Sequence, residues 1–184
     1  MAKIAVVFHS GYGHTLRMAQ SVAEGAGATL VPIDADGNLA EGAWETLAAA
    51  DAIIMGSPTY MGMVSWQFKK FADASSKPWF GQAWKDKIFA GFTNSASMNG
   101  DKLSTIQYLI TLAMQHGGVW VGTAQMPANS KAAQRNDVGY LGTFSGAMAQ
   151  SPSDASAAEM LPGDLETASL FGKRVAEIAT KFRG

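Results

Sequence analysis

Short apolar runs alternate with amphipathic segments along this chain, and the alternation constrains the fold more than any other feature. The runs are rich in Val, Ile and Ala, which is typical of strands covered on both faces. Strands separated by helices pair in parallel through right-handed crossovers, so the pattern predicts an α/β fold with a doubly wound five-stranded sheet and helices on both faces. The expected strands are residues 3–10, 28–34, 51–57, 87–95 and 118–125.

The segments between the runs carry apolar residues at helical spacing. Pro32 lacks a backbone N–H, so the second strand is expected at an edge of the sheet. In the segment 98–118 the apolar residues expected to face the core are Leu103, Ile106, Ile110 and Ala113. Asp164 is expected to cap a last helix, whose apolar stripe is Ala168, Phe171, Val175, Ile178 and Phe182.

Composition limits the classes of function that the chain supports. Its 184 residues suit a single domain, 1–184, and the net charge of -1 provides no basic surface for nucleic acid or anionic lipid. There is no Cys, and the 3 His residues are scattered, so no metal site is expected. No apolar run is long enough to span a bilayer, so we expect no membrane insertion and a cytoplasmic location.

Residues 123–163 form a long segment rich in Ala, Ser, Gly, Met and Pro. Connections longer than about 12 to 15 residues are uncommon in compact domains unless they are functional. This segment also carries the apolar side chains of Tyr140, Leu141, Phe144 and Met148. We therefore predict that it covers an active site or forms an oligomer contact.

Three polar loops follow the first, third and fourth expected strands. In open parallel sheets, ligands bind beyond the carboxyl ends of the strands, where these loops would meet. Each loop is short of charge and rich in hydroxyl groups, amides and Gly. The loops are Ser10, Gly11, Tyr12, Gly13, His14 and Thr15; Ser57, Pro58, Thr59, Tyr60, Met61 and Gly62; and Thr93, Asn94, Ser95, Ala96, Ser97, Met98, Asn99 and Gly100.

The first loop is suited to an anion. Backbone N–H groups at a helix start, together with the helix dipole, bind a phosphate without Lys or Arg. Ser10 and Thr15 add hydroxyl donors, while Gly11 and Gly13 allow the backbone to approach closely. The alternative interpretation is an ordinary glycine-rich turn with a Ser or Thr cap.

Other phosphate-binding motifs match less well. A dinucleotide fingerprint requires a third Gly where this chain has Leu16, although Asp34 lies where a ribose-binding acid would be expected. A Walker loop requires Gly-Lys-Ser/Thr, which does not follow. A phospho-receiver domain requires an Asp near the end of a strand, but Asp51 begins the third strand.

The second and third loops favour a flat heteroaromatic ring. Backbone groups of residues 59–62 and 94–99 are suited to hydrogen bonding with an imide edge, and Tyr60, Met61 or Trp79 could cover a ring face.

Four stretches resemble the WrbA-like, flavodoxin-fold NAD(P)H:quinone oxidoreductases, in the same order and spacing. They are HSGYGHT, GSPTYMG, KIFAGFTNSASMNGDKLSTIQYL and LAMQHGGVWVG. The resemblance implies the strand order 2-1-3-4-5 and FMN as cofactor. The phosphate would lie on 10–15, and the ring would meet 58–62 and 94–99.

The resemblance also implies roles for residues outside these loops. His116 would reach the flavin site, often from a neighbouring subunit, although an alignment shifted by one residue places Gln115 there. Trp79 would line the substrate side, and Tyr12 would meet the nicotinamide nucleotide. This chain departs from the family at Tyr60-Met61, where the family often has Arg-Phe, and in its third loop, which carries less Gly.

The expected activity is two-electron transfer from NADH or NADPH to FMN and then to a small quinone, with ping-pong kinetics. Because the cofactor carries the chemistry, we expect no catalytic acid or base side chain. A homodimer or homotetramer is expected from the aromatic residues of 76–87 and 123–163. The alternatives are a single-electron carrier of the flavodoxin type, and a nucleotide-binding or scaffold protein without redox activity.

Overall fold

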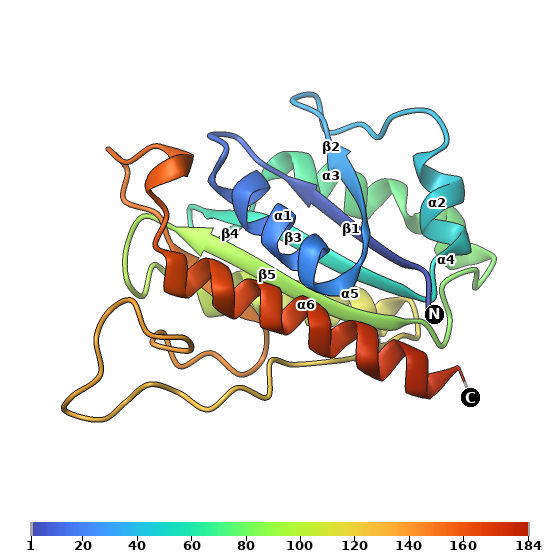
Figure 1. The fold of residues 1–184 in the computed structure, drawn as a ribbon. Coiled ribbons are helices and arrows are strands. Elements are labelled where there is room, and N and C mark those ends of the chain that lie inside the picture. Colours follow the sequence, from blue (N-terminus) through green and yellow to red (C-terminus); the bar gives the residue numbers. More distant parts are fainter. Residues whose placement is uncertain (1, 184) are drawn as a thin grey trace.

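A computed structural model describes residues 2–183 and has the expected α/β architecture (Figure 1). The predicted domain 1–184 also includes Met1 and Gly184, which lie outside the described residues. The elements are β1 (Ile4–His9), α1 (His14–Ala26), β2 (Thr29–Ile33), α2 (Ala43–Ala49), β3 (Ala52–Tyr60), β4 (Met63–Val64), α3 (Trp66–Ala74), α4 (Ser76–Phe80), β5 (Ile88–Ser95), α5 (Lys102–Gln115), β6 (Val119–Trp120), β7 (Ala147–Gln150), a 3-10 turn η1 (Ala157–Glu159) and α6 (Pro162–Phe182).

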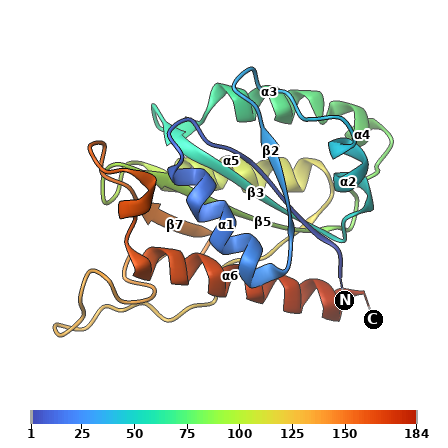
Figure 2. The same cartoon turned by 45° about the horizontal axis from the view of Figure 1, so that its top comes forward.

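The sheet order is β2-β1-β3-β5-β6, with parallel pairing throughout this path. Because β4 is only a short antiparallel partner of β3, this order is the predicted 2-1-3-4-5 arrangement. Pro32 lies in β2 at the edge of the sheet, which confirms its predicted position. The turned view also shows the helices on the two faces of the sheet (Figure 2).

Alternate residues of the strands build two separate cores. Val6 and Phe8 of β1 face α1 and α6, whereas Ala5 and Val7 face the side covered by α2, α3 and α5. The first core is closed by tight contact between α1 and α6. A Cβ atom at Gly172 would lie 2.1 Å from the Val22 carbonyl oxygen, so only Gly allows the two helices to approach this closely.

The predicted fifth strand, 118–125, is wrong in its extent. Only Val119–Trp120 pair with the start of β5, and β7 pairs with Phe92–Ser95 at its end. The chain leaves the sheet after β6 and returns after residue 146. Gly122 allows this crossing, because a Cβ atom there would lie 2.3 Å from the Phe144 carbonyl oxygen.

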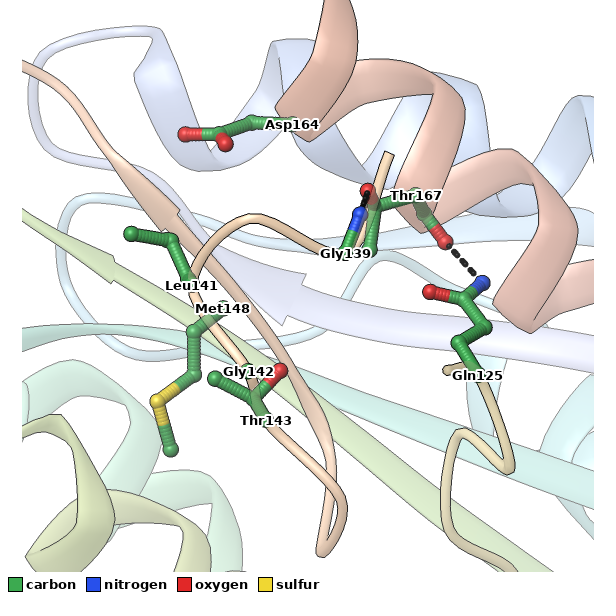
Figure 3. Close-up of a pocket in the computed structure, with 8 residues that line it drawn as sticks. All are labelled: Gln125, Gly139, Leu141, Gly142, Thr143, Met148, Asp164 and Thr167. Carbon is green, nitrogen blue, oxygen red and sulfur yellow. Dashed lines mark hydrogen bonds between the residues drawn. The ribbon is translucent and has the colours of Figure 1, made fainter. Parts of the chain in front are cut away.

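The excursion between β6 and β7 is tied to α6 (Figure 3). The backbone N–H of Gly139 donates to Thr167 Oγ1 at 2.9 Å, and Gln125 Nε2 donates to the Thr167 carbonyl at 2.9 Å. The cavity beside these contacts has a volume of about 10 Å³, which is room for a single water molecule. The predicted long loop 123–163 therefore contains a strand and a 3-10 turn and lies against the body of the domain.

Two helix predictions also need correction. In α5, Leu103 is half exposed and Ile110 is only partly buried, while Lys102, Leu109 and Leu112 are buried. Asp164 does not cap α6, because Leu161 is the N-cap residue and the Asp164 carboxylate instead binds Arg135.

Candidate functional site

The loop after β1 folds around the hydroxyl group of Ser10. Ser10 Oγ accepts hydrogen bonds from the backbone N–H groups of Gly13 (3.1 Å) and Leu16 (3.0 Å). Gly13 is the N-cap residue of α1 and has a φ of 89°, a conformation that favours Gly. The N–H groups of Gly13 and Leu16 are therefore used within the loop, and the positive end of α1, at His14 and Thr15, lies at the carboxyl edge of the sheet.

Tyr60, at the end of β3, leans against this loop. A Cβ atom at Gly11 would lie 2.5 Å from Tyr60 Oη, and the rings of Tyr12 and Tyr60 meet edge to face at 6.2 Å. Burial raises the pKa of the Tyr60 phenol, and the neighbouring Tyr12 adds to this shift. The two aromatic rings therefore form one side of the space above the strand ends.

The second predicted loop is partly strand. Ser57–Tyr60 continue β3, and the chain turns only at Met61 and Gly62, which have φ values of 48° and 80°. Beneath the turn, Thr59 Oγ1 lies 2.8 Å from both Thr93 Oγ1 and Thr105 Oγ1. These hydrogen bonds fix the ends of β3 and β5 relative to α5.

Two buried serines and His9 reinforce the same end of the sheet. His9 Nδ1 lies 2.8 Å from Ser65 Oγ, and the Ser65 backbone N–H donates to Ser57 Oγ at 3.0 Å. Burial lowers the pKa of His9. Because its side chain is buried and already bonded, we assign His9 a structural role.

Asn94 connects three segments around the carboxyl ends of the strands. Thr15 Oγ1 donates to Asn94 Oδ1 at 2.6 Å, and Asn94 Nδ2 donates to Ser151 Oγ at 2.8 Å. His14 Nε2 lies 2.8 Å from the carbonyl oxygen of Ala155. The segment after β7 is therefore tied to the first turn of α1.

These segments enclose a cavity of about 570 Å³. No Lys, Arg, Asp or Glu side chain is among the described residues that line it. The lining offers hydroxyl groups, an amide, two tyrosine rings and backbone groups. Its residues are Tyr12, His14, Thr15, Pro58, Thr59, Tyr60, Asn94, Ser95, Ala96, Ser151, Ser153 and Ala155.

Comparison with known proteins assigns the chain to a family. Residues 34–133 match the model of the NADPH-dependent FMN reductase family. Flavodoxin FldP of Pseudomonas aeruginosa is 56% identical over 178 residues, covering 97% of each chain. The chain belongs to the NADPH-dependent FMN reductase family.

Other relatives agree with this family. An NAD(P)H dehydrogenase (quinone) of Archaeoglobus fulgidus is 32% identical over 205 aligned residues, covering 98% of this chain and 99% of the relative. The crystal structure of a flavodoxin, WrbA-like protein from Agrobacterium tumefaciens is 58% identical, covers 98% of this chain and 99% of its own, and has a TM-score of 0.81. The predicted WrbA-like, flavodoxin-fold membership and FMN as cofactor are thereby confirmed.

The residues of the cavity fit the FMN of this reductase family. The N-terminal end of α1, which lies at the cavity through His14 and Thr15, suits a phosphate, and Gly11 leaves no room for a side chain where Tyr60 approaches. Hydroxyl, amide and backbone groups of β3 and β5 suit the polar edge of an isoalloxazine ring, and the tyrosines suit its face.

Several predicted residues lie outside the cavity lining. The first loop is held by the hydrogen bond between Gly13 and Ser10 and by the contact of Gly11 with Tyr60, and these three loop residues do not line the cavity. Thr93 connects β5 to β3 through its hydrogen bond with Thr59. Met98 and Asn99 line a different hollow of about 640 Å³, shared with residues 128–131, Ala133, Tyr140 and Leu141.

His116 and Trp79 lie at the opposite end of the sheet from the cavity. Both line a hollow of about 430 Å³ together with Gln115, next to the start of β5. His116 is buried, its Nε2 lies 2.9 Å from Ser75 Oγ, and burial lowers its pKa. A single chain therefore does not bring these residues to its own cavity, and a role at a neighbouring subunit's flavin stays a prediction.

Sequence reasoning missed the wall formed by Ser151, Ser153 and Ala155. They follow β7, a strand that the sequence pattern did not indicate. It also missed Lys102, a buried charged side chain that donates a hydrogen bond to Ser95 of the cavity wall. Within residues 2–183, no helix is long and apolar enough to cross a membrane, and no group of three or more His, Cys, Asp or Glu side chains is placed to hold a metal ion.

Proposed function

We propose that this protein is an FMN-dependent NAD(P)H:quinone oxidoreductase. The observation that carries the proposal is the uncharged cavity of about 570 Å³, which the ends of β1, β3 and β5 share. Relatives named NAD(P)H dehydrogenase (quinone), at 32% to 37% identity, support the same activity. When bound, FMN supplies hydride chemistry that links a reduced nicotinamide to a quinone.

In this proposal the chain binds and orients rather than reacts. The first turn of α1 holds the phosphate, and Thr15 and Asn94 fix the loops on either side of it. Tyr12, 80% exposed, and Tyr60 border the open side, where the nicotinamide and then the quinone would stack. The walls act by keeping the reacting atoms near contact distance, about 3 to 3.5 Å.

The experiment is a visible spectrum of the purified protein before and after anaerobic addition of NADH or NADPH. We expect flavin absorption that bleaches with at least one nicotinamide and returns when benzoquinone is added. Steady-state rates with varied quinone should give the parallel lines of a ping-pong mechanism. Bound FMN without NAD(P)H oxidation would refute the enzyme activity.

A single-electron carrier is the second candidate, because the relative at 56% identity is named a flavodoxin. A reduction titration with two well-separated one-electron steps, together with slow NAD(P)H oxidation, would favour it. The net charge of -1 weighs against a carrier that relies on electrostatic steering toward a redox partner.

We further propose that subunits assemble so that Trp79 and His116 of one chain approach the cavity of another. Trp79 and His116 share their hollow with Phe80, which is 84% exposed, and Met114, which is half exposed. Exposed apolar side chains gathered in one place support a contact with another subunit. Sedimentation as a monomer at micromolar concentration, with FMN bound, would contradict this assembly.

A further inference from the structure

Lys102, the first residue of α5, is a charged side chain with almost no exposure to solvent. It is 2% exposed, and its ammonium lies beneath the loop that follows β5. Nζ donates to Ser95 Oγ at 3.0 Å, to the Ser97 carbonyl at 2.7 Å and to the Met98 carbonyl at 2.9 Å. All three protons of the ammonium are therefore used to hold this loop.

The charge of Lys102 is not matched by a carboxylate. The nearby Asp164 binds Arg135 through two hydrogen bonds of 2.8 Å and also accepts the backbone N–H of Gln150 at 2.9 Å. Within residues 2–183, Lys102 makes no ion pair. An unpaired buried charge is costly to fold, and here only hydroxyl and carbonyl dipoles compensate for it.

The ammonium lies one residue behind the wall of the FMN cavity. Ser95, which accepts its hydrogen bond, lines that cavity together with Ala96. Gln150 Nε2 donates to the Ala96 carbonyl at 3.2 Å and holds the loop from its other side. Because Lys102 is shielded from water and salt, its positive charge acts on the cavity with little screening.

We propose that Lys102 positions the loop 95–98 against the flavin and that its buried charge stabilises the negative charge that FMN gains on reduction. This inference rests on the proposed function.

The pH dependence of this effect follows from the surroundings of the ammonium. Burial lowers the pKa of Lys102 to about 8, with Arg135 acting in the same direction and Asp164 opposing it. The other charged group near the start of α5 is Asp101, which is exposed. Above pH 8 the neutral amine has two protons for three acceptors, so both the charge and one hydrogen bond are lost.

The test compares Lys102→Met, Lys102→Arg and the exposed-site control Lys173→Met, with circular dichroism to verify folding. For Lys102→Met we expect FMN to bind about tenfold or more weakly and its midpoint potential to become more negative. Lys102→Arg keeps the charge and should restore most of both properties. Lys173→Met should match the unmodified protein.

The unmodified protein supplies a second test that does not depend on a variant's folding. Between pH 7 and 9.5 its FMN affinity should fall, and its midpoint potential should become more negative than that of Lys102→Arg. Matching pH profiles for the two proteins would overturn the inference, as would a folded Lys102→Met with unchanged affinity and potential. Failure of the unmodified protein to bind FMN would instead overturn the proposed function, and this inference with it.

Discussion

Asn94 shows how one side chain organises the cavity. Its amide accepts from Thr15 on α1 and donates to Ser151 after β7, and only 5% of the residue is exposed. Both neighbours are hydroxyl groups that lose a partner if the amide is removed. The cost of leaving a buried polar group without a partner is about 1 to 3 kcal/mol.

Asn94→Ala is therefore expected to lower the free energy of unfolding by about 1 to 3 kcal/mol and to weaken FMN binding. Urea denaturation and a fluorescence titration with FMN measure the two effects. Asn129→Ala is the matched control, because Asn129 is exposed on the excursion and should change neither. Unchanged FMN affinity in Asn94→Ala would remove Asn94 from the binding site.

The buried histidines give the stability a defined pH dependence. Burial lowers the pKa of both His9 and His116 below 6.5 in the folded protein. As the pH falls below 6.5, the unfolded chain takes up protons that the folded chain does not. Stability should therefore decrease with falling pH in this range, by up to about 1.4 kcal/mol per pH unit for each histidine.

Urea denaturation of the unmodified protein, His9→Gln and His116→Gln between pH 5 and 8 measures this slope. In each variant the free energy of unfolding should depend less steeply on pH than in the unmodified protein. The difference in this free energy at pH 8 reports only lost packing and hydrogen bonds. Identical slopes in all three proteins would show that the histidines do not cause the acid destabilisation.

At the scale of elements, the contact between α1 and α6 depends on backbone approach. Gly172→Ala would place a methyl group 2.1 Å from the Val22 carbonyl oxygen, so the helices must separate. We expect a loss of stability of about 1 to 3 kcal/mol, measured by thermal or urea unfolding. Gly81→Ala is a control, because its new methyl group would meet nothing closer than 3.9 Å, and equal stability of the two variants would contradict close packing.

The buried strands were predicted correctly from the sequence, whereas the extent of the last strand and the burial of polar residues such as Lys102 were not. β1, β3 and β5 were found because strands buried on both faces carry uninterrupted apolar runs. β2 was also found, although it lies at the edge of the sheet and exposes Thr29 and Pro32. The last strand was misplaced because its apolar run, 118–125, continues beyond the two residues that pair with β5.

Helical periodicity failed in α5 for a similar reason. A periodic pattern assigns apolar residues to the core and charges to solvent. At the start of α5 the ammonium of Lys102 donates hydrogen bonds to the loop after β5. Lys102 is therefore buried, while Leu103 is half exposed. The composition of the loops after β1, β3 and β5 indicated that they would meet at one cavity, whereas the place of Ser151 in its lining was not predicted, because β7 was not recognised.

For the whole molecule, the exposed aromatic end near α4 is the surface expected to bind another subunit. Phe80→Glu should shift the sedimentation coefficient toward the monomer without changing the circular dichroism spectrum, because Phe80 is 84% exposed. Phe182→Glu is the control, since Phe182 is 56% exposed at the end of α6, lies outside both segments expected to contact another subunit, and should leave the assembly unchanged.

The same experiment tests whether His116 and Trp79 act at a neighbour's flavin. If they do, the monomers produced by Phe80→Glu will bind FMN more weakly than the assembled protein. Dissociation with unchanged FMN affinity would show that each subunit binds its cofactor alone.

The interrupted edge strand determines when the cofactor site is completed during synthesis. The ribosome delivers the β1–α1 loop first, but Ser151 emerges only after β7 has followed the excursion, and α6 must still cover the sheet. A nascent chain that stops short of β7 has the β1–α1 loop but lacks the opposite wall of the cavity. Stable FMN retention should therefore begin only near the end of translation, so the cofactor is expected to bind a domain whose other strands and helices have already been synthesised.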